Sequence, residues 1–187
     1  MEKLLLGLVV GLTLALAAPW AGSNLPLAQQ PNTPVDPLAP LSFLVGRWRS
    51  TSEGDPGKGS GEREYTRVLE NRFLQAMNRV TYPPQEKNPK GETHEDVGLF
   101  SYDRARKRIV LRQFHTEGFV NQYVMEAGTP DGPIVFTSES IENIPAGFRA
   151  RETYRRIGPD EFEEIFEIAE PAKDFAVYSR ARLTRVK

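Results

Sequence analysis

Short alternating segments separated by turn residues are the feature that most constrains how this chain can fold. Ten such segments follow residue 46, and apolar and polar side chains alternate in them with the period of two that a β-strand imposes. Only the stretch at 37–46 favours helical turns. The predicted strands are residues 47–53, 62–69, 72–82, 97–102, 108–115, 119–126, 134–141, 148–156, 161–168 and 175–186.

The connections between these segments are short, which predicts an antiparallel sheet whose strands pair in chain order. Glu70-Asn71 is a candidate two-residue hairpin turn, because Asn tolerates the left-handed conformation. An open sheet of about ten strands would leave two exposed edges, and closure into a barrel removes them. We therefore predict an all-β, up-and-down antiparallel barrel of about ten strands, preceded by a short helical turn that Gly46 ends. A barrel of this size can enclose a ligand cavity.

The N-terminal residues have a different character. Lys3 precedes an apolar run from Leu4 to Ala18 that ends in small residues, which is the pattern of a secretory signal peptide. A membrane anchor and a buried helix are the alternatives, although the run is shorter than the roughly 20 residues that span a bilayer. We predict a signal peptide at 1–21, cleaved between about residues 17 and 28. A proline-rich linker at 22–36 and a barrel domain at 37–187 follow, so the domain is expected in the periplasm or outside the cell.

Composition excludes several classes of function. The net charge is −1, which gives no electrostatic attraction to nucleic acid or to an anionic membrane. The chain has no cysteine, so disulfides, thiolate metal sites and a cysteine nucleophile are excluded. The predicted partner is therefore a small molecule, with no nucleic acid and, after signal cleavage, no membrane.

Two candidate site residues, Arg112 and His115, lie in the predicted strand 108–115. Arg112 shares a face with Val110 and Phe114, whereas His115 lies on the other face, so an unbulged strand can turn only one of the two toward the lumen. An arginine between apolar residues must pair with an acid or bind an anion. A histidine in the lumen could bind a ligand or transfer protons.

Metal binding and catalysis receive little support from the sequence. His94 lies in a predicted loop among Glu92, Glu95 and Asp96, and alternation divides these side chains between two faces, so no metal site is predicted. No nucleophile, base and orienting residue assemble, so no catalytic residue is predicted. An isomerase or cyclase that uses His115 with a carboxylate such as Glu152 or Glu164 remains an alternative, as does a structural barrel without a ligand.

Three motifs resemble one group of known barrels. LSFLVGRW at 41–48 is a helical lead-in followed by L-x-G-x-W, HEDVGLF at 94–100 is similar to H-x-E-x-G followed by an aromatic residue, and SRARLTRV at 179–186 is similar to a last strand. Their order and spacing resemble the lipocalin-related (calycin) barrels, and within these the nitrobindin and fatty-acid-binding-protein-like group. The resemblance covers residues 37–187.

This resemblance implies a ten-stranded barrel that binds haem or another apolar molecule near its mouth. In nitrobindins a histidine at the start of the closing strand ligates the haem iron. Tyr178 stands at the best-matching position here, and tyrosine can ligate ferric haem. Alternation in 175–186 nevertheless predicts that Tyr178 faces away from the lumen, opposite to Val177 and Ala181.

The fatty-acid-binding relatives suggest a second kind of site. A buried arginine and a tyrosine commonly hold the ligand carboxylate in these barrels, which implies a role for Arg112 with Tyr123 or Tyr154. Trp48 is predicted chiefly to pack the closed end and is also a candidate binding residue. The sequence thus predicts an exported, non-catalytic barrel for a small apolar or anionic amphipathic ligand, with haem at Tyr178 or His115 as the alternative. The candidate ligand-binding residues are Trp48, Arg112, Phe114, His115, Tyr123 and Tyr154.

Overall fold

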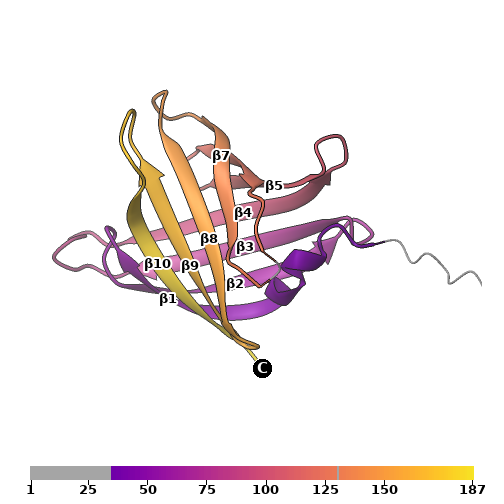
Figure 1. The fold of residues 1–187 in the computed structure, drawn as a ribbon. Coiled ribbons are helices and arrows are strands. Elements are labelled where there is room, and N and C mark those ends of the chain that lie inside the picture. The colour runs from indigo at the N-terminus through magenta and orange to yellow at the C-terminus, as the bar shows by residue number, and fades with distance from the viewer. Residues whose placement is uncertain (1–34, 130) are drawn as a thin grey trace, which may run out of the picture. The chain divides into compact units, whose positions relative to one another are not determined.

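The structure is a computed structural model that describes residues 35–129 and 131–187. The predicted signal peptide and nearly all of the predicted linker lie outside the described residues. The described part forms one 3-10 helix and ten strands (Figure 1). These are η1 (Ala39–Leu44), β1 (Gly46–Gly54), β2 (Gly59–Val68), β3 (Phe73–Tyr82), β4 (Glu92–Asp103), β5 (Arg108–His115), β6 (Val120–Met125), β7 (Ile134–Glu142), β8 (Arg149–Gly158), β9 (Glu161–Ala169) and β10 (Ala176–Arg185).

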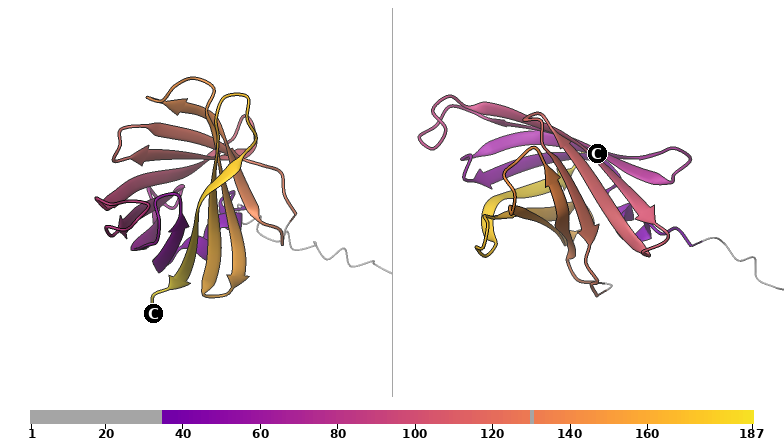
Figure 2. Two further views of the ribbon diagram at one scale, coloured as in Figure 1. Left: turned by 90° about the vertical axis from the view of Figure 1, so that its left-hand side faces the viewer. Right: turned by 90° about the horizontal axis from the view of Figure 1, so that it is seen from above.

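The strands form a closed antiparallel barrel, as the sequence predicts. Each strand pairs with its neighbours in the chain, and β1 pairs with β10 to close the sheet. The closing register runs from Trp48 opposite Arg185 to Gly54 opposite Ser179. Figure 2 shows the strands wrapping around a common interior. Closure satisfies the backbone groups that two sheet edges would otherwise leave unpaired.

Strand β4 differs most from its predicted bounds. It begins at Glu92 rather than at residue 97, because the polar run that was predicted as a loop pairs with β3 from Tyr82 opposite Glu92 to Asn78 opposite Asp96. Polar side chains are compatible with a strand here because the inward face borders the polar side of an internal cavity. His94 consequently lies on a strand and faces the lumen.

The turn between β2 and β3 is also longer than predicted. Three consecutive residues, Leu69, Glu70 and Asn71, have positive φ angles of 50°, 58° and 62°. Asn commonly adopts this left-handed region, but Leu and Glu rarely do. The sequence signal at Asn71 therefore located the turn correctly but underestimated its length.

An apolar core fills the end of the barrel that η1 covers. Trp48 is buried, its ring centroid lies 4.7 Å from that of Phe162, and its indole Nε1 donates a hydrogen bond of 2.6 Å to the carbonyl of Leu44 in η1. Trp48 thus packs the closed end, as predicted. The cluster also contains Leu41, Leu74, Phe100, Leu111, Phe136 and Leu183.

Arg185 at the end of β10 fastens η1 to the barrel. Its guanidinium lies 4.1 Å from the centroid of the Trp48 ring and donates hydrogen bonds to the carbonyls of Phe43 (2.8 Å) and Val45 (2.7 Å). These carbonyls at the end of a short helix lack partners within the helix, so a cationic donor there stabilises them. The first and last strands and the helical turn are therefore held by one side chain.

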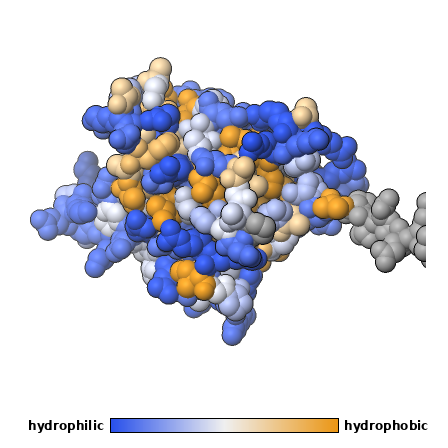
Figure 3. Space-filling view, viewed as in Figure 1, coloured by the Kyte–Doolittle hydropathy of each residue, from blue (hydrophilic) through white to orange (hydrophobic). Residues whose placement is uncertain are grey.

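Rows of opposite charge cover the outer face of β8, β9 and β10. Arg151 pairs with Glu167 at 2.7 Å, Arg155 pairs with Glu163 at 3.3 Å, and Arg182 pairs with Glu161. Exposed pairs of this kind contribute little individually to stability. Figure 3 shows one face of the molecule, where hydrophilic residues surround small, separated hydrophobic groups.

Among the described residues, no helix is both long enough and apolar enough to cross a bilayer.

The two phenylalanines Phe162 and Phe114 offer a matched test of this packing. Phe162 is fully buried against Trp48, whereas Phe114 is 48% exposed on the outer face. We expect Phe162→Ala to lower the free energy of unfolding by about 3–5 kcal/mol, because it leaves a cavity in the closed end. Phe114→Ala should lower it by less than about 1 kcal/mol. Urea unfolding followed by tryptophan fluorescence measures both values, and equal losses would contradict the assigned core.

Candidate functional site

A cavity of about 500 Å³ occupies the other end of the barrel. Its lining residues lie near the strand ends remote from η1, and the β1–β2 and β3–β4 loops project at this end (Figure 1). The volume falls within the range of small-molecule sites. The closed core lies beneath the cavity, so the cavity opens toward one end of the barrel.

One wall of the cavity is apolar. It is built from β7, β9 and the loop before β8, whose inward positions carry aliphatic and aromatic side chains. The period-two patterns of these strands place these side chains inside. A wall of this kind binds the apolar body of a ligand. Its members are Ile141, Ile144, Phe148, Phe166 and Ile168.

A buried ion pair forms the floor. The Arg63 guanidinium of β2 donates a hydrogen bond of 2.5 Å to Glu164 of β9, and both side chains are 10% exposed. Burial alone would lower the pKa of Arg63, but the charge of Glu164 more than offsets this and raises it. Arg63 therefore stays charged inside the barrel, because Glu164 compensates for its desolvation.

A line of hydrogen bonds leads from this floor to the cavity mouth. Arg63 Nε donates to Asn78 Oδ1 (3.1 Å), and Asn78 Nδ2 donates to Asp96 Oδ2 (2.7 Å). Asp96 Oδ2 lies 3.5 Å from His94 Nε2, and His94 Nδ1 lies 2.8 Å from Glu117. Burial alone would lower the pKa of His94, but its bonds to these two carboxylates raise it to about 9. His94 is therefore cationic at neutral pH.

His115 faces the lumen and is neutral. Its ring stacks on Phe119 with centroids 4.1 Å apart, its Nδ1 lies 3.5 Å from His94 Nε2, and its Nε2 lies 3.4 Å from Asn121 Nδ2. Burial lowers the pKa of His115 to about 4, although the charge of Asp96 acts in the opposite direction. A neutral imidazole at this position can accept a hydrogen bond or bind a metal ion.

Three buried polar atoms lining the cavity lack a hydrogen-bond partner among the described residues. They are the hydroxyl oxygen of Ser50 and the amide oxygens of Gln113 and Asn121. Gln113 and Asn121 pair across β5 and β6, so their oxygens come from one part of the wall. Unpaired buried acceptors are costly, and a ligand or water that donates hydrogen bonds here would remove that cost.

Glu152 lies deeper in the cavity as a neutral acid. It is buried and accepts a 2.5 Å hydrogen bond from the Tyr154 hydroxyl. Burial, followed by the charge of Glu164, raises the pKa of Glu152 to about 8, and the bond from Tyr154 only partly opposes this. At neutral pH this carboxyl therefore retains its proton.

The structure separates the residues predicted from the sequence into three groups. Arg112 lies on the outside, where it donates to Gln122 (3.1 Å) and Ser101 (3.3 Å), and its neighbour Phe114 is also exposed. The anion site proposed for Arg112 is therefore wrong, because strand parity turns this side chain to solvent. His115 takes the inward position instead.

Tyr123, Tyr154 and Trp48 lie inside the barrel but do not line the cavity. All three are at most 2% exposed and belong to the closed core. The hydroxyl of Tyr123 accepts a hydrogen bond of 2.7 Å from Asn121, and that of Tyr154 binds Glu152, so the two tyrosines support the residues above them.

Tyr178 lines the cavity, contrary to the alternation argument. The register between β10 and β9 shifts between Val177 and Ser179, so Tyr178 is the extra residue of a β-bulge. A bulge inverts the parity of the residues on one side of it. The half-buried ring meets Phe166 edge to face with centroids 5.8 Å apart. Burial, with the nearby charges of Glu92 and Asp55, raises the pKa of its hydroxyl.

Strand parity and pairing contain a partial signal for the polar cavity residues that the sequence analysis did not identify. Gln113 lies two positions before His115 and shares its face, and Asp96 lies directly opposite His115 in the register of β4 and β5. Once a histidine is placed inside, these two residues follow from parity and pairing. Asn121 follows in the same way, because it lies opposite Gln113 in the register of β5 and β6. Arg63 depends on its contact with Glu164 across the lumen and had no local signal.

These features define a ligand-binding β-barrel with one closed end and a cavity that is apolar on one wall and polar on its floor. Residues 37–185 match the model of the family described as the THAP4-like, heme-binding beta-barrel domain. The chain belongs to this family, which confirms the resemblance to nitrobindins. No match was found among curated proteins.

Solved structures match this chain at low identity. Rv2717c from M. tuberculosis is 19% identical, with a TM-score of 0.60, and the alignment covers 81% of this chain and 98% of that one. The S-type phycobiliprotein lyase CPES from Guillardia theta is 15% identical, with a TM-score of 0.48 over 78% of this chain and 89% of the lyase. A redesigned β-barrel bound to DFHBI is 9% identical, with a TM-score of 0.43 over 76% and 99%.

The raised pKa of Glu152 predicts how stability depends on pH. The folded chain keeps this proton up to about pH 8, whereas the unfolded chain loses it near the ordinary value of 4.5. The folded state therefore binds more protons between these values, and its stability falls as the pH rises through the window, by at most about 1.4 kcal/mol per pH unit.

Glu152→Gln removes this titration and keeps the shape of the protonated acid. We expect the free energy of unfolding of the native chain, measured by urea between pH 5 and 8, to decline relative to that of Glu152→Gln. His94 and His115 titrate in both proteins, so the difference isolates Glu152. A difference that stays constant over this range would show that Glu152 is ionised in the fold.

Proposed function

We propose that the barrel binds haem in its cavity, with Tyr178 as the iron ligand. The observation that carries this proposal is the bulge in β10, which turns Tyr178 into the lumen of a domain from a haem-binding family. The closing strand is also where the related nitrobindins place their iron ligand. Haem binding is thereby favoured over the binding of an unspecified apolar ligand that the sequence first suggests.

The residues around Tyr178 suit such a group. The apolar wall of Phe148, Phe166 and Ile168 can cover the flat face of a macrocycle, and a phenol oxygen is a suitable donor to ferric iron. Tyr178 would lose its proton on coordination, because a metal ion lowers the pKa of its ligands and so offsets the effect of burial. Haem, when bound, supplies a redox-active iron that can take a further small ligand.

Arg149 is the cation best placed for the acidic edge of such a ligand. It lines the cavity at the start of β8, and its guanidinium donates a 2.6 Å hydrogen bond to the carbonyl of Lys173 in the β9–β10 turn. Arg149 is exposed at the rim, where its guanidinium lies 4.9 Å from the centroid of the Phe175 ring that Arg151 also contacts. A guanidinium at the mouth can bind a carboxylate that remains in contact with water.

Titration with ferric haem tests the proposal. We expect the full chain to bind one haem with a shifted Soret band, and Tyr178→Phe to weaken binding by about tenfold or more, which equals about 1.4 kcal/mol or more. Tyr82→Phe is the matched control, because Tyr82 also lines the cavity. Absence of a Soret shift in the native chain would overturn haem binding. Loss in His115→Gln but not in Tyr178→Phe would assign the iron to His115.

A small amphipathic ligand is the second candidate, and the three unpaired acceptors favour it. Such a ligand would place an apolar body on the wall of Phe166 and Ile168 and give hydrogen bonds to Ser50, Gln113 and Asn121. This retains the non-catalytic function first predicted but moves its polar contacts from Arg112 to these residues. A fluorescent fatty alcohol that binds the cavity, and is displaced by haem, would place both ligands in one site.

We also propose that the domain is exported. Support comes from Lys3 and the apolar run Leu4–Ala18, followed by the proline-rich residues 22–36. Mass spectrometry of the protein from the cell envelope or medium should give an N-terminus between about residues 18 and 29. Recovery from the cytoplasm with Met1 or residue 2 at its N-terminus would contradict export.

A further inference from the structure

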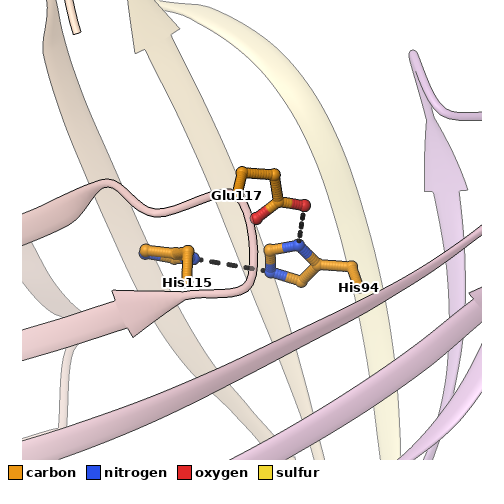
Figure 4. Close-up of side chains that lie close together, drawn as sticks. All are labelled: His94, His115 and Glu117. Atoms are coloured by element: carbon orange, nitrogen blue, oxygen red, sulfur yellow. Dashed lines mark hydrogen bonds and ion pairs between the residues drawn. The ribbon is translucent and has the colours of Figure 1, made fainter. Parts of the chain in front are cut away.

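Two histidines and a glutamate converge at the mouth of the cavity, in a cluster that does not include Tyr178 (Figure 4). His94 lies on β4, His115 ends β5, and Glu117 lies in the following turn. The register of β4 and β5 places Asp96 opposite His115, so His94 is a diagonal neighbour of His115 on the same inward face. These are the chain's only histidines, and the fold brings them together.

The spacing of the ligand atoms suits a transition-metal ion. His94 Nε2 and His115 Nδ1 are 3.5 Å apart. Two nitrogens bound to zinc at about 2.0–2.1 Å with a tetrahedral angle lie roughly 3.3–3.4 Å apart, so these imidazoles need little movement. One ligand atom from each of the three residues lies within 4.8 Å of the other two. Glu117 contacts His94 Nδ1 at 2.8 Å, so it must leave this nitrogen to bind the ion, and its 50% exposed side chain in a turn allows that movement.

Polar contacts surround both imidazoles. Asp96 Oδ2, which Asn78 fixes, lies 3.5 Å from His94 Nε2, the nitrogen that faces the metal position, so it places a carboxylate beside the ion. The other nitrogen of His115 faces Asn121, whose amide oxygen has no partner among the described residues. A half-turn of this amide would present its oxygen to the ring N–H that remains when His115 Nδ1 binds a metal. Metal-bound histidines commonly donate to such an oxygen.

The charge of the cavity also favours a cation. Besides the protonated Glu152, its lining contains four carboxyl groups, against two guanidinium groups and the cationic His94. One guanidinium, that of Arg63, is already paired with Glu164. Glu92, Asp96 and Glu117 all lie on the side of β4 and β5. A histidine must be neutral to bind a metal, so a divalent ion here would displace the proton of His94 and offset the remaining negative charge.

We propose that His94, His115 and Glu117 bind a divalent transition-metal ion of the zinc type at the cavity mouth. Two imidazoles and one carboxylate favour zinc over magnesium or calcium, which prefer oxygen donors. Three protein ligands leave a fourth position for water or for an anionic group of a molecule in the cavity. This revises the absence of metal predicted from the sequence, because His94 lies on a strand and its partners come from β5 and the next turn.

Zinc titration of the full chain without a histidine tag tests this site. Calorimetry should detect one Zn²⁺ per chain. His94→Ala and His115→Ala should each weaken Zn²⁺ affinity by more than the roughly 10- to 100-fold that loss of a residue outside the ligand set causes. Glu95→Gln is the matched control, because Glu95 neighbours His94 in sequence but points outward to Arg79 at 2.6 Å. Unchanged affinity in both histidine variants would overturn the proposal.

A second measurement needs no substitution. Because the chain has two histidines, ¹⁵N-edited NMR resolves both rings, and Zn²⁺ should shift both sets of signals at one equivalent. Unshifted rings at excess Zn²⁺ would mean that His94 only forms ion pairs with Asp96 and Glu117. Tyr178→Phe should bind Zn²⁺ as the native chain does, so failure of the haem proposal and failure of the metal proposal give different results.

Discussion

The buried pair of Arg63 and Glu164 is the constraint on which the interior of this barrel depends. It joins β2 to β9 across the lumen, and neither charge could remain in so dry a place without the other. The pair separates an apolar plug from an open cavity. Arg63 also begins the line of polar contacts that passes through Asn78 and Asp96 to His94, so the ion pair at the floor helps to position the side chains at the cavity mouth.

The mouth contains two groups of candidate metal ligands on facing parts of the wall. Tyr178 belongs to β10, whereas His94 and His115 belong to β4 and β5, which are four and five steps from β10 around the barrel. The tyrosine has aromatic surroundings that suit a large apolar group. The imidazoles have carboxylate surroundings that suit a small cation. The same opening thus offers two different coordination environments, and occupancy of one would change the charge felt by the other.

Local sequence patterns predict the barrel but only part of its site. Alternation and short turns determine strands and closure, and parity correctly limits the lumen to one of Arg112 and His115. The prediction that Tyr178 faces away from the lumen is wrong, because a single-residue bulge depends on the packing of two strands and cannot be recognised from alternation within one strand. The polar run before Val97 resembled a loop, since the cavity that makes it a strand is formed by residues distant in the chain.

The bulge at Tyr178 also means that two consecutive residues, Tyr178 and Ser179, line the same cavity. A regular strand offers its interior every second residue, so a site on such a strand changes only by replacing one side chain with another. A bulge allows the cavity lining to change in a second way. Gaining or losing one residue in the bulge reverses which side chains of the adjoining segment face inward, while the pairing of β10 with β1 stays intact. Variation in the length of this strand could therefore exchange ligands in the lumen without any change in the residues on either side.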